Sequence, residues 1–229
     1  MSRVLVVGAS GHAKVVLDII EQEGRHEVVG LLDDFKPPET AWYGYQVDGP
    51  VANVAELAAR RNADGVFVAI GDNWIRSQIV ERLKSLVPHL TFVSPVHPSA
   101  RLARGVTLGG GSVVMAGATI NSDSVLGEHC IVNTNASVDH DNRLGSFSSV
   151  APGVATGGNV TLGDFAAIGI GASLLQGRRI GQHAVVGAGS VVTRDIPEYT
   201  VAYGIPAKPI RTRTAGDFGT TAINRGTRR

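Results

Sequence analysis

One spacing constrains this chain more than any other feature. From residue 96 onward an aliphatic side chain recurs at every sixth position, in seventeen positions of which sixteen are aliphatic and Thr156 is not. The residue four places further on is usually small or aliphatic, and Asn142 and Arg178 depart from that rule. A period of six fits neither an α-helix nor an alternating strand, whereas a parallel β-helix needs one inward aliphatic side chain in each short strand.

The period predicts a prism of stacked coils. Three hexads close one roughly triangular coil of 18 residues, so the series spans between five and six coils, each packed on the next. An ordinary β-sandwich does not fit, because its turns recur every ~8–12 residues without a common register. We therefore expect a parallel β-helix over residues 95–210.

The first 94 residues follow another pattern, in which strands alternate with helices. We predict strands at 3–7, 28–32, 65–70 and 90–93, helices after Gly11, over 51–61 and after Asp72, and a loop over 35–50. The third helix should be capped by Asp72 and bury Ile75, Ile79, Leu83 and Leu86. This order predicts a parallel α/β domain with a Rossmann-like layout, in which ligands bind at the carboxyl ends of the strands.

The glycine turn at residues 8–12, with the sequence GASGH, follows the first predicted strand. It lacks the G-x-G-x-x-G pattern of dinucleotide sites. Such a turn can bring backbone N–H groups and a helix N-terminus close to a phosphate, and it can equally be a plain strand-to-helix turn. The motif by itself leaves both interpretations open.

Composition excludes several classes of function. The formal net charge of +1 argues against nucleic-acid binding by bulk electrostatics. No apolar run reaches the ~20 residues of a membrane span, and the N-terminus enters a strand without a signal-peptide pattern. The single cysteine, Cys130, occupies a small inward position and is predicted to lie in the core. We expect a cytoplasmic protein.

Several motifs together resemble one family. These are G-A-S-G-H-A-K at 8–14, D-D at 33–34, A-I-G-D-N at 69–73, the hexads, and G-I-P-A-K at 204–208. From Val4 to about Ile210 the chain resembles the hexapeptide-repeat acyltransferases, in particular the nucleotide-sugar N-acetyltransferases of bacterial glycan and O-antigen (lipopolysaccharide) synthesis that act on UDP-N-acetylbacillosamine precursors or GDP-perosamine. The resemblance implies a Rossmann-like domain, a left-handed β-helix, and a homotrimer with active sites between neighbouring prisms.

The same resemblance implies which residues bind the substrates. It assigns the nucleotide-linked 4-amino-4,6-dideoxy sugar to Ser10, Gly11, His12, Asp33, Asp34, Gly71, Asn73 and Asn133. It assigns the co-substrate acetyl-CoA to Ser149, Gly158, Ile170, Ala188, Pro206 and Lys208, and it implies no metal. Ser149 stands where some relatives carry a second histidine. On sequence alone, the 204–208 segment fits a turn that seals the last coil as well as one that closes over coenzyme A.

His140 and Asp141 are the predicted catalytic pair. From periodicity alone His140 is read as a surface histidine, and the resemblance makes it the base, since a histidine followed by an acid stands at this point of the family. A histidine suits removal of a proton from an attacking amine near neutral pH, and Asp141 would raise its basicity and fix its tautomer. Adjacent residues on a flat strand point to opposite faces, so the two side chains meet only if the backbone bends.

Other functions remain open at this point. An O-acetyltransferase acting on a sialic-acid-like sugar also needs a base, and a non-catalytic nucleotide-sugar-binding scaffold would show the same fold. A zinc enzyme resembling the γ-class carbonic anhydrases needs three convergent histidines. His129, His140 and His183 do not stack at intervals of 18, and His129 and His183 are expected to face solvent. Residues 211–229 are predicted to form a disordered polar tail.

Overall fold

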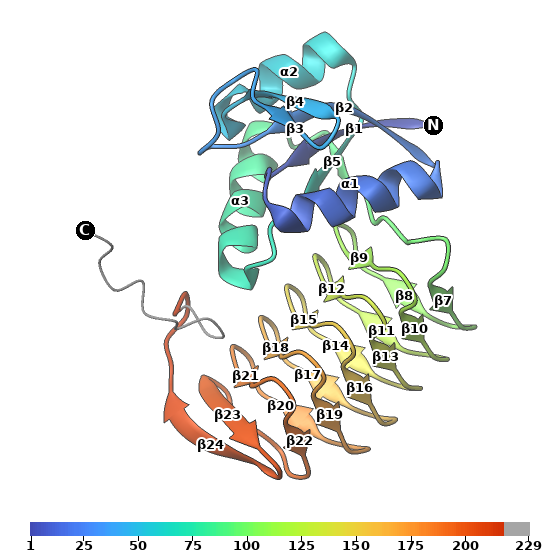
Figure 1. Cartoon of the computed structure of the whole chain (residues 1–229), viewed down its shortest axis with the longest axis vertical. Coiled ribbons are helices and arrows are strands. Elements are labelled where there is room, and N and C mark those ends of the chain that lie inside the picture. The colour runs from blue at the N-terminus through green and yellow to red at the C-terminus, as the bar shows by residue number, and fades with distance from the viewer. Residues whose placement is uncertain (218–229) are drawn as a thin grey trace.

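The computed structural model describes residues 1–217, and residues 218–229 lie outside it. Figure 1 shows the α/β unit at one end of a prism of short strands, which a hairpin closes at the other end. The α/β sheet has the order β3-β4-β2-β1-β5-β6. Its elements are β1 (Ser2–Val7), α1 (Gly11–Glu23), β2 (His26–Leu32), β3 (Ala41–Trp42), β4 (Tyr45–Gly49), the 3₁₀ helix η1 (Val51–Asn53), α2 (Val54–Arg61), β5 (Gly65–Val68), α3 (Asn73–Leu86) and β6 (Thr91–Phe92).

Apolar side chains cover both faces of this sheet. Val4 and Val6 of β1 pack with α1, whereas Leu5 and Val7 pack with α2 and α3. A parallel strand that is buried on both faces has a continuous apolar sequence, and the predicted strands are confirmed here for that reason. The predicted helices are confirmed as well. The predicted Asp72 cap is also confirmed, because its carboxylate accepts hydrogen bonds from the N–H groups of Trp74 and Ile75.

Two details of the predicted α/β unit are wrong. The expected loop at 35–50 contains β3 and β4, and β4 joins the sheet edge through the pair Leu31 and Val47. Val47 is the one fully buried apolar side chain of β4, so the strand has little hydrophobic pattern to find. The buried face of α3 is also rotated: Arg76, Ser77, Val80 and Leu83 are buried, whereas Leu86 is 40% exposed.

The prism has three parallel sheets, here called faces, in which each strand pairs with the one 18 residues away. The first face contains β7 (Arg101–Leu102), β10 (Thr119–Ile120), β13 (Ser137–Val138), β16 (Ala155–Thr156), β19 (Ser173–Leu174) and β22 (Val191–Val192). The second contains β8 (Thr107–Leu108), β11 (Val125–Leu126), β14 (Arg143–Leu144), β17 (Thr161–Leu162) and β20 (Arg179–Ile180). The third contains β9 (Val113–Val114), β12 (Ile131–Val132), β15 (Ser149–Val150), β18 (Ala167–Ile168), β21 (Val185–Val186), β23 (Thr200–Gly204) and the antiparallel β24 (Ala207–Thr212).

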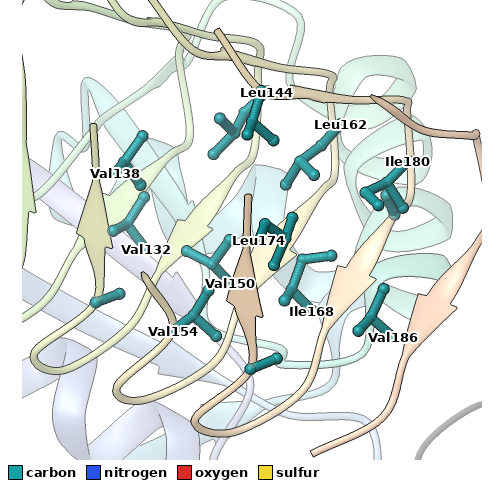
Figure 2. Packing of buried hydrophobic residues seen from close by; sticks show 14 of the residues in the cluster. Val132, Val138, Leu144, Val150, Val154, Leu162, Ile168, Leu174, Ile180 and Val186 are labelled. Carbon is teal, nitrogen blue, oxygen red and sulfur yellow. The ribbon is translucent and has the colours of Figure 1, made fainter. Parts of the chain in front are cut away.

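The prism interior is a column of aliphatic side chains, as the hexads predict. Figure 2 shows Val132, Val138, Leu144 and Val150 pointing inward and packing on the equivalent residues of neighbouring coils. Cys130 is fully buried among them, which confirms its predicted place in the core. Stacking these residues removes their surface from water in every coil, so the six-residue spacing is sufficient to specify the architecture.

Short turns join the faces at three corners. The first corner links the first face to the second and includes residues 139–142 and 157–160. The second corner links the second face to the third and includes residues 127–130, 145–148, 163–166 and 181–184. The third corner links the third face back to the first and includes residues 133–136, 169–172 and 187–190. Most of these turns contain one residue with positive φ, which bends the chain sharply.

The ordered chain continues past the predicted boundary at residue 210. Strand β24 reaches Thr212, and Arg213 donates its backbone N–H to the carbonyl of Tyr199. Gly216 lies against the ring of Trp74. Residues 211–217 are therefore structured, and the rest of the predicted tail, 218–229, lies outside the described residues.

Candidate active site

His140 and Asp141 form a hydrogen-bonded pair at the first corner. Nδ1 of His140 lies 2.7 Å from Oδ2 of Asp141, and both side chains are about half exposed, at 49% and 52%. The bend that the sequence requires is present, because Asp141 has a φ of 57° and stands in the turn after β13. The hydrogen bond to the Asp141 carboxylate raises the pKa of His140 above its ordinary value.

The backbone around His140 is held on both sides. Its N–H donates to the carboxylate of Asp139, and its carbonyl accepts from the N–H of Asn159 in the next coil. Gly158 lies directly against the imidazole, since a Cβ at this position would be 2.5 Å from both Cε1 and Nε2 of His140. A residue predicted to contact the co-substrate thus touches the predicted base.

Asp33 and Asp34 follow β2 directly, at the carboxyl end of the strand. The Asp33 carboxylate accepts hydrogen bonds from the backbone N–H groups of Ala9, Phe35 and Lys36, and so ties the glycine turn to the next loop. The Asp34 carboxylate accepts from the N–H of Val51 and pairs with Arg82 at 2.8 Å. Both acids are engaged within the fold.

Ser10, Gly11 and His12 stand at the start of α1. Ser10 is exposed, and its side chain makes no capping hydrogen bond. Burial, with a smaller contribution from Arg76, lowers the pKa of His12 to about 4, so the ring is neutral at pH 7. Its Nε2 is buried without a hydrogen-bond partner among the described residues, and Gly71 lies beside the ring.

Two lysines that the sequence did not single out lie next to this turn. The ammonium groups of Lys14 and Lys36 are 4.8 and 4.3 Å from the ring centroid of Trp42. Cations at this distance from an indole are attracted to the face of the ring. Two positively charged side chains are therefore held beside the N-terminus of α1.

Arg76 joins the α/β unit to the second corner and was missed by sequence reasoning. It is 1% exposed. Its guanidinium donates to the side chain of Asn73 and to four backbone carbonyls. Two carbonyls belong to the α/β unit (Ile70 and Gly71) and two to the prism (His129 and Phe147). Asn73 in turn donates weakly to the carbonyls of Phe165 and Ala166, at 3.4 Å each. Its spacing was the available signal, because Arg76 lies four residues before Val80 and seven before Leu83, on one stripe of the helix.

The expectation that His129 and His183 face solvent is wrong. Both are buried, at 1% and 8% exposed, in a continuous stack of rings along the second corner. Adjacent rings are 4.5–5.1 Å apart and nearly parallel, and Phe92 and Trp74 of the α/β unit pack against the stack, whose members are His129, Phe147, Phe165, His183 and Tyr199. Burial lowers the pKa of His129 to about 4 and that of His183 in the same direction. The hexad register alone does not show that α3 covers this corner.

A cleft of about 110 Å³ lies between the start of α3 and the third face of the prism. Gly71 and Asn73, predicted to contact the sugar, and Ser149, predicted to contact the co-substrate, line it together with Trp74 and Arg213. This cleft brings together residues from both predicted sets of contacts.

The remaining predicted residues gather at the third corner. Ile170 is 62% exposed there, and Ala188 occupies the equivalent place one coil further on. The β23–β24 hairpin with Pro206 and Lys208 pairs with β21 of the same face. Asn133 also lies at this corner, where its side chain accepts the N–H of Thr134. One chain therefore keeps His140 and the predicted co-substrate residues other than Gly158 on different corners or faces.

The described residues contain neither a cluster of metal ligands nor a membrane-spanning helix. Within residues 1–217, no three His, Cys, Asp or Glu side chains gather as a metal ion would require. In the same range, no helix combines the length and the hydrophobicity that crossing a membrane needs.

Comparison with known proteins identifies relatives of this chain. A family model described as the PglD N-terminal domain matches residues 3–83. UDP-N-acetylbacillosamine N-acetyltransferase of Bacillus subtilis (strain 168) is 38% identical over 120 residues, which are 51% of this chain and 52% of that protein. The match thus spans about half the length of this curated relative.

Solved structures match more of the chain. GDP-perosamine N-acetyl transferase from Caulobacter crescentus, solved as a histidine-to-alanine variant with CoA and GDP-perosamine, has a TM-score of 0.86 and 37% identity, over 92% of this chain and 98% of that one. The acetyltransferase domain of PglB from Neisseria gonorrhoeae, in complex with acetyl coenzyme A, has a TM-score of 0.83 and 34% identity, over 91% and 98%. This chain belongs to the family of hexapeptide-repeat nucleotide-sugar N-acetyltransferases.

Proposed function

We propose that this protein transfers the acetyl group of acetyl-CoA to the 4-amino group of a nucleotide-linked 4-amino-4,6-dideoxy sugar, with His140 as the general base. The observation that carries the proposal is the 2.7 Å bond between His140 and Asp141 at an exposed corner. It occupies Nδ1, so Nε2 is the nitrogen that accepts the amine proton as the amine attacks the thioester carbonyl. The C–N bond forms, the C–S bond breaks, and the coenzyme A thiolate leaves. General-base assistance of this kind contributes roughly 10²–10⁴-fold.

The glycine turn and the N-terminus of α1 support a nucleotide-bearing acceptor. A helix N-terminus with free N–H groups attracts a diphosphate, and Lys14 and Lys36 add positive charge beside it. Ser10 and Gly11 lie at that N-terminus. In this proposal Asp33 and Asp34 act by holding the surrounding loops, and His12 contributes the buried, unpaired Nε2.

We also propose that the active unit is a homotrimer. The base stands on the first corner, whereas Ser149 stands on the third face and Ile170 and Ala188 on the third corner. A closed ring of three copies would place His140 of one copy against the cleft and third corner of its neighbour. The cytoplasmic location expected from the sequence remains a prediction.

Mixing two inactive variants tests the shared site. His140→Ala removes the base, and Ala188→Trp blocks the exposed third corner without touching the first. If each site takes its base from one copy and its co-substrate corner from another, co-expression of the two variants restores part of the activity. Activity that stays at the level of the separate variants would contradict a site shared between copies.

The reaction itself is tested by following coenzyme A release with a thiol reagent. The assay uses acetyl-CoA and a panel of UDP-, GDP- and dTDP-4-amino-4,6-dideoxy sugars, with wild type, His140→Ala and, as a matched control, the exposed His89→Ala. We expect turnover with one amino sugar and a loss of 10²-fold or more in His140→Ala alone. Turnover with only a sialic-acid-like hydroxyl acceptor would favour the O-acetyltransferase, and binding without turnover would favour the scaffold.

A further inference from the structure

The two departures from the hexad rule that lie on neighbouring coils are neighbours in space. Asn142 replaces a small inward residue and is 0% exposed, and Thr156 replaces an inward aliphatic residue and is 7% exposed. The Asn142 amide donates to the Thr156 hydroxyl at 2.9 Å. Both lie inside the prism beneath the turn at 139–142, which presents His140 and Asp141.

In most other coils the position equivalent to Asn142 holds a smaller residue, which forms fewer side-chain hydrogen bonds. At the equivalent inward positions, the hydroxyl of Ser112 donates to the carbonyl of Gly127 and accepts the N–H of Cys130, and Ser124 makes the same two bonds in its own coil. Asn142 reproduces this pair with the carbonyl of Gly157 and the N–H of Val160. Its two amide hydrogens are shared among that carbonyl and two further acceptors, which a serine hydroxyl with one hydrogen cannot all serve.

Both additional bonds concern the turn that carries His140. One goes to the carbonyl of Asp139 at 2.8 Å, which also accepts the Ser124 hydroxyl at 2.7 Å. The other goes to Thr156, whose hydroxyl accepts the N–H of Asp139 at 3.1 Å. The Asp139 carboxylate accepts the N–H of His140 at 2.8 Å and the amide of Asn121 at 3.0 Å. The backbone polar groups of Asp139 are therefore bonded on both sides, one residue before His140.

This network is not required for the prism to fold. Polar groups inside an apolar core are costly unless they are hydrogen-bonded, and an aliphatic residue fills the Thr156 position in every other hexad of the series. Valine has nearly the shape of threonine, and serine is the residue found at 112, 124, 148 and 190. The fold therefore has a simpler solution at both positions.

We propose that Asn142 and Thr156 are positioning residues for the acetyl transfer, which fix the turn at 139–141 and through it the imidazole of His140. The inference rests on the proposed function in which His140 is the base. By holding Asp139, the two side chains determine where the next peptide begins, and so keep Asp141 in the bent conformation from which its carboxylate reaches His140. An imidazole misplaced by about 1 Å can lose on the order of 10²-fold in rate.

The test is the double variant Asn142→Ser/Thr156→Val, which restores the hexad rule at both positions. We expect its melting temperature to equal or exceed that of wild type, its kcat to fall at least 10-fold, and both KM values to stay within about 2-fold. The acidic limb of its pH profile should move to lower pH, because a loosened Asp141 no longer raises the pKa of His140. In a His140→Ala background the same two substitutions should cause no further loss of kcat.

Ser112→Ala is the matched control. It removes an equally buried hydroxyl with the same bonding pattern at the second corner, and kcat should remain that of wild type. Wild-type kcat in the double variant, together with an inactive His140→Ala, would overturn the positioning role while leaving the proposed base intact. Full kcat in His140→Ala would instead overturn the proposed base. A further loss in the His140→Ala background would show that the pair acts other than through His140.

Discussion

Replacing Gly158 by alanine tests how closely the imidazole of His140 must be placed. The added Cβ would lie 2.5 Å from Cε1 and Nε2, and 3.1 Å from Cδ2. Carbon atoms in contact are about 3.5–4.0 Å apart, so the ring must retreat by about 1 Å. Gly158 does not have a positive φ, so alanine adds no backbone strain there. The exposed imidazole can move without unfolding the chain.

The expected cost falls on the chemical step. A displacement of about 1 Å at a reacting group can lower the rate on the order of 10²-fold, which corresponds to about 2.7 kcal/mol of activation free energy. Steady-state kinetics with saturating amino sugar should therefore show kcat reduced about 10²-fold in Gly158→Ala, with a melting temperature close to that of wild type. Gln176→Ala, at the equivalent place one coil further on, is the control and should keep wild-type kcat.

The alternative role of Gly158 makes the opposite prediction. If this residue mainly contacts coenzyme A, alanine should raise the KM for acetyl-CoA and leave kcat unchanged at saturation. That result would refute the inference that Gly158 provides the space for the imidazole.

Three further predictions concern the candidate site and the contact between the α/β unit and the prism. Asp141→Asn removes the carboxylate that raises the pKa of His140, so the acidic limb of the kcat/KM profile should move to lower pH. At pH values above that limb, kcat should fall about 10-fold or more. An unmoved limb would show that Asp141 does not set the pKa of His140. Arg76→Met leaves four carbonyls without their charged donor, and chemical denaturation should show a loss of about 3 kcal/mol or more, with an unchanged midpoint contradicting a structural role. Dialysis against EDTA should leave turnover unchanged, and a loss restored by zinc would revive the metalloenzyme interpretation.

The sequence was most informative where a repeating contact determines structure. Each inward aliphatic residue meets its equivalent 18 residues away, so the period alone predicts three faces, parallel pairing and the buried place of Cys130. It was least informative where two parts of the chain meet. The ring stack and Arg76 depend on α3 covering the second corner, and that contact joins residues more than 50 positions apart in the sequence.

For the candidate site, the sequence predicted residue types better than their arrangement. His140 and Asp141 were predicted as a pair, but the positive φ that lets these neighbouring side chains meet is a property of the folded corner. The departures Asn142 and Thr156 were visible as exceptions to the period, while their shared position under His140 needs the coil geometry. The separation of His140 from Ser149 and Ile170 follows from the three-fold division of each coil.

The surface of the prism on which the α/β unit packs repeats from coil to coil. The unit can therefore occupy only certain positions along the prism. Arg76 binds the carbonyls of His129 and Phe147, which lie one coil apart, and the stack offers similar carbonyls and rings in the coils that follow. A shift of the α/β unit along the prism would therefore occur in steps of one inter-strand spacing, about 4.8 Å.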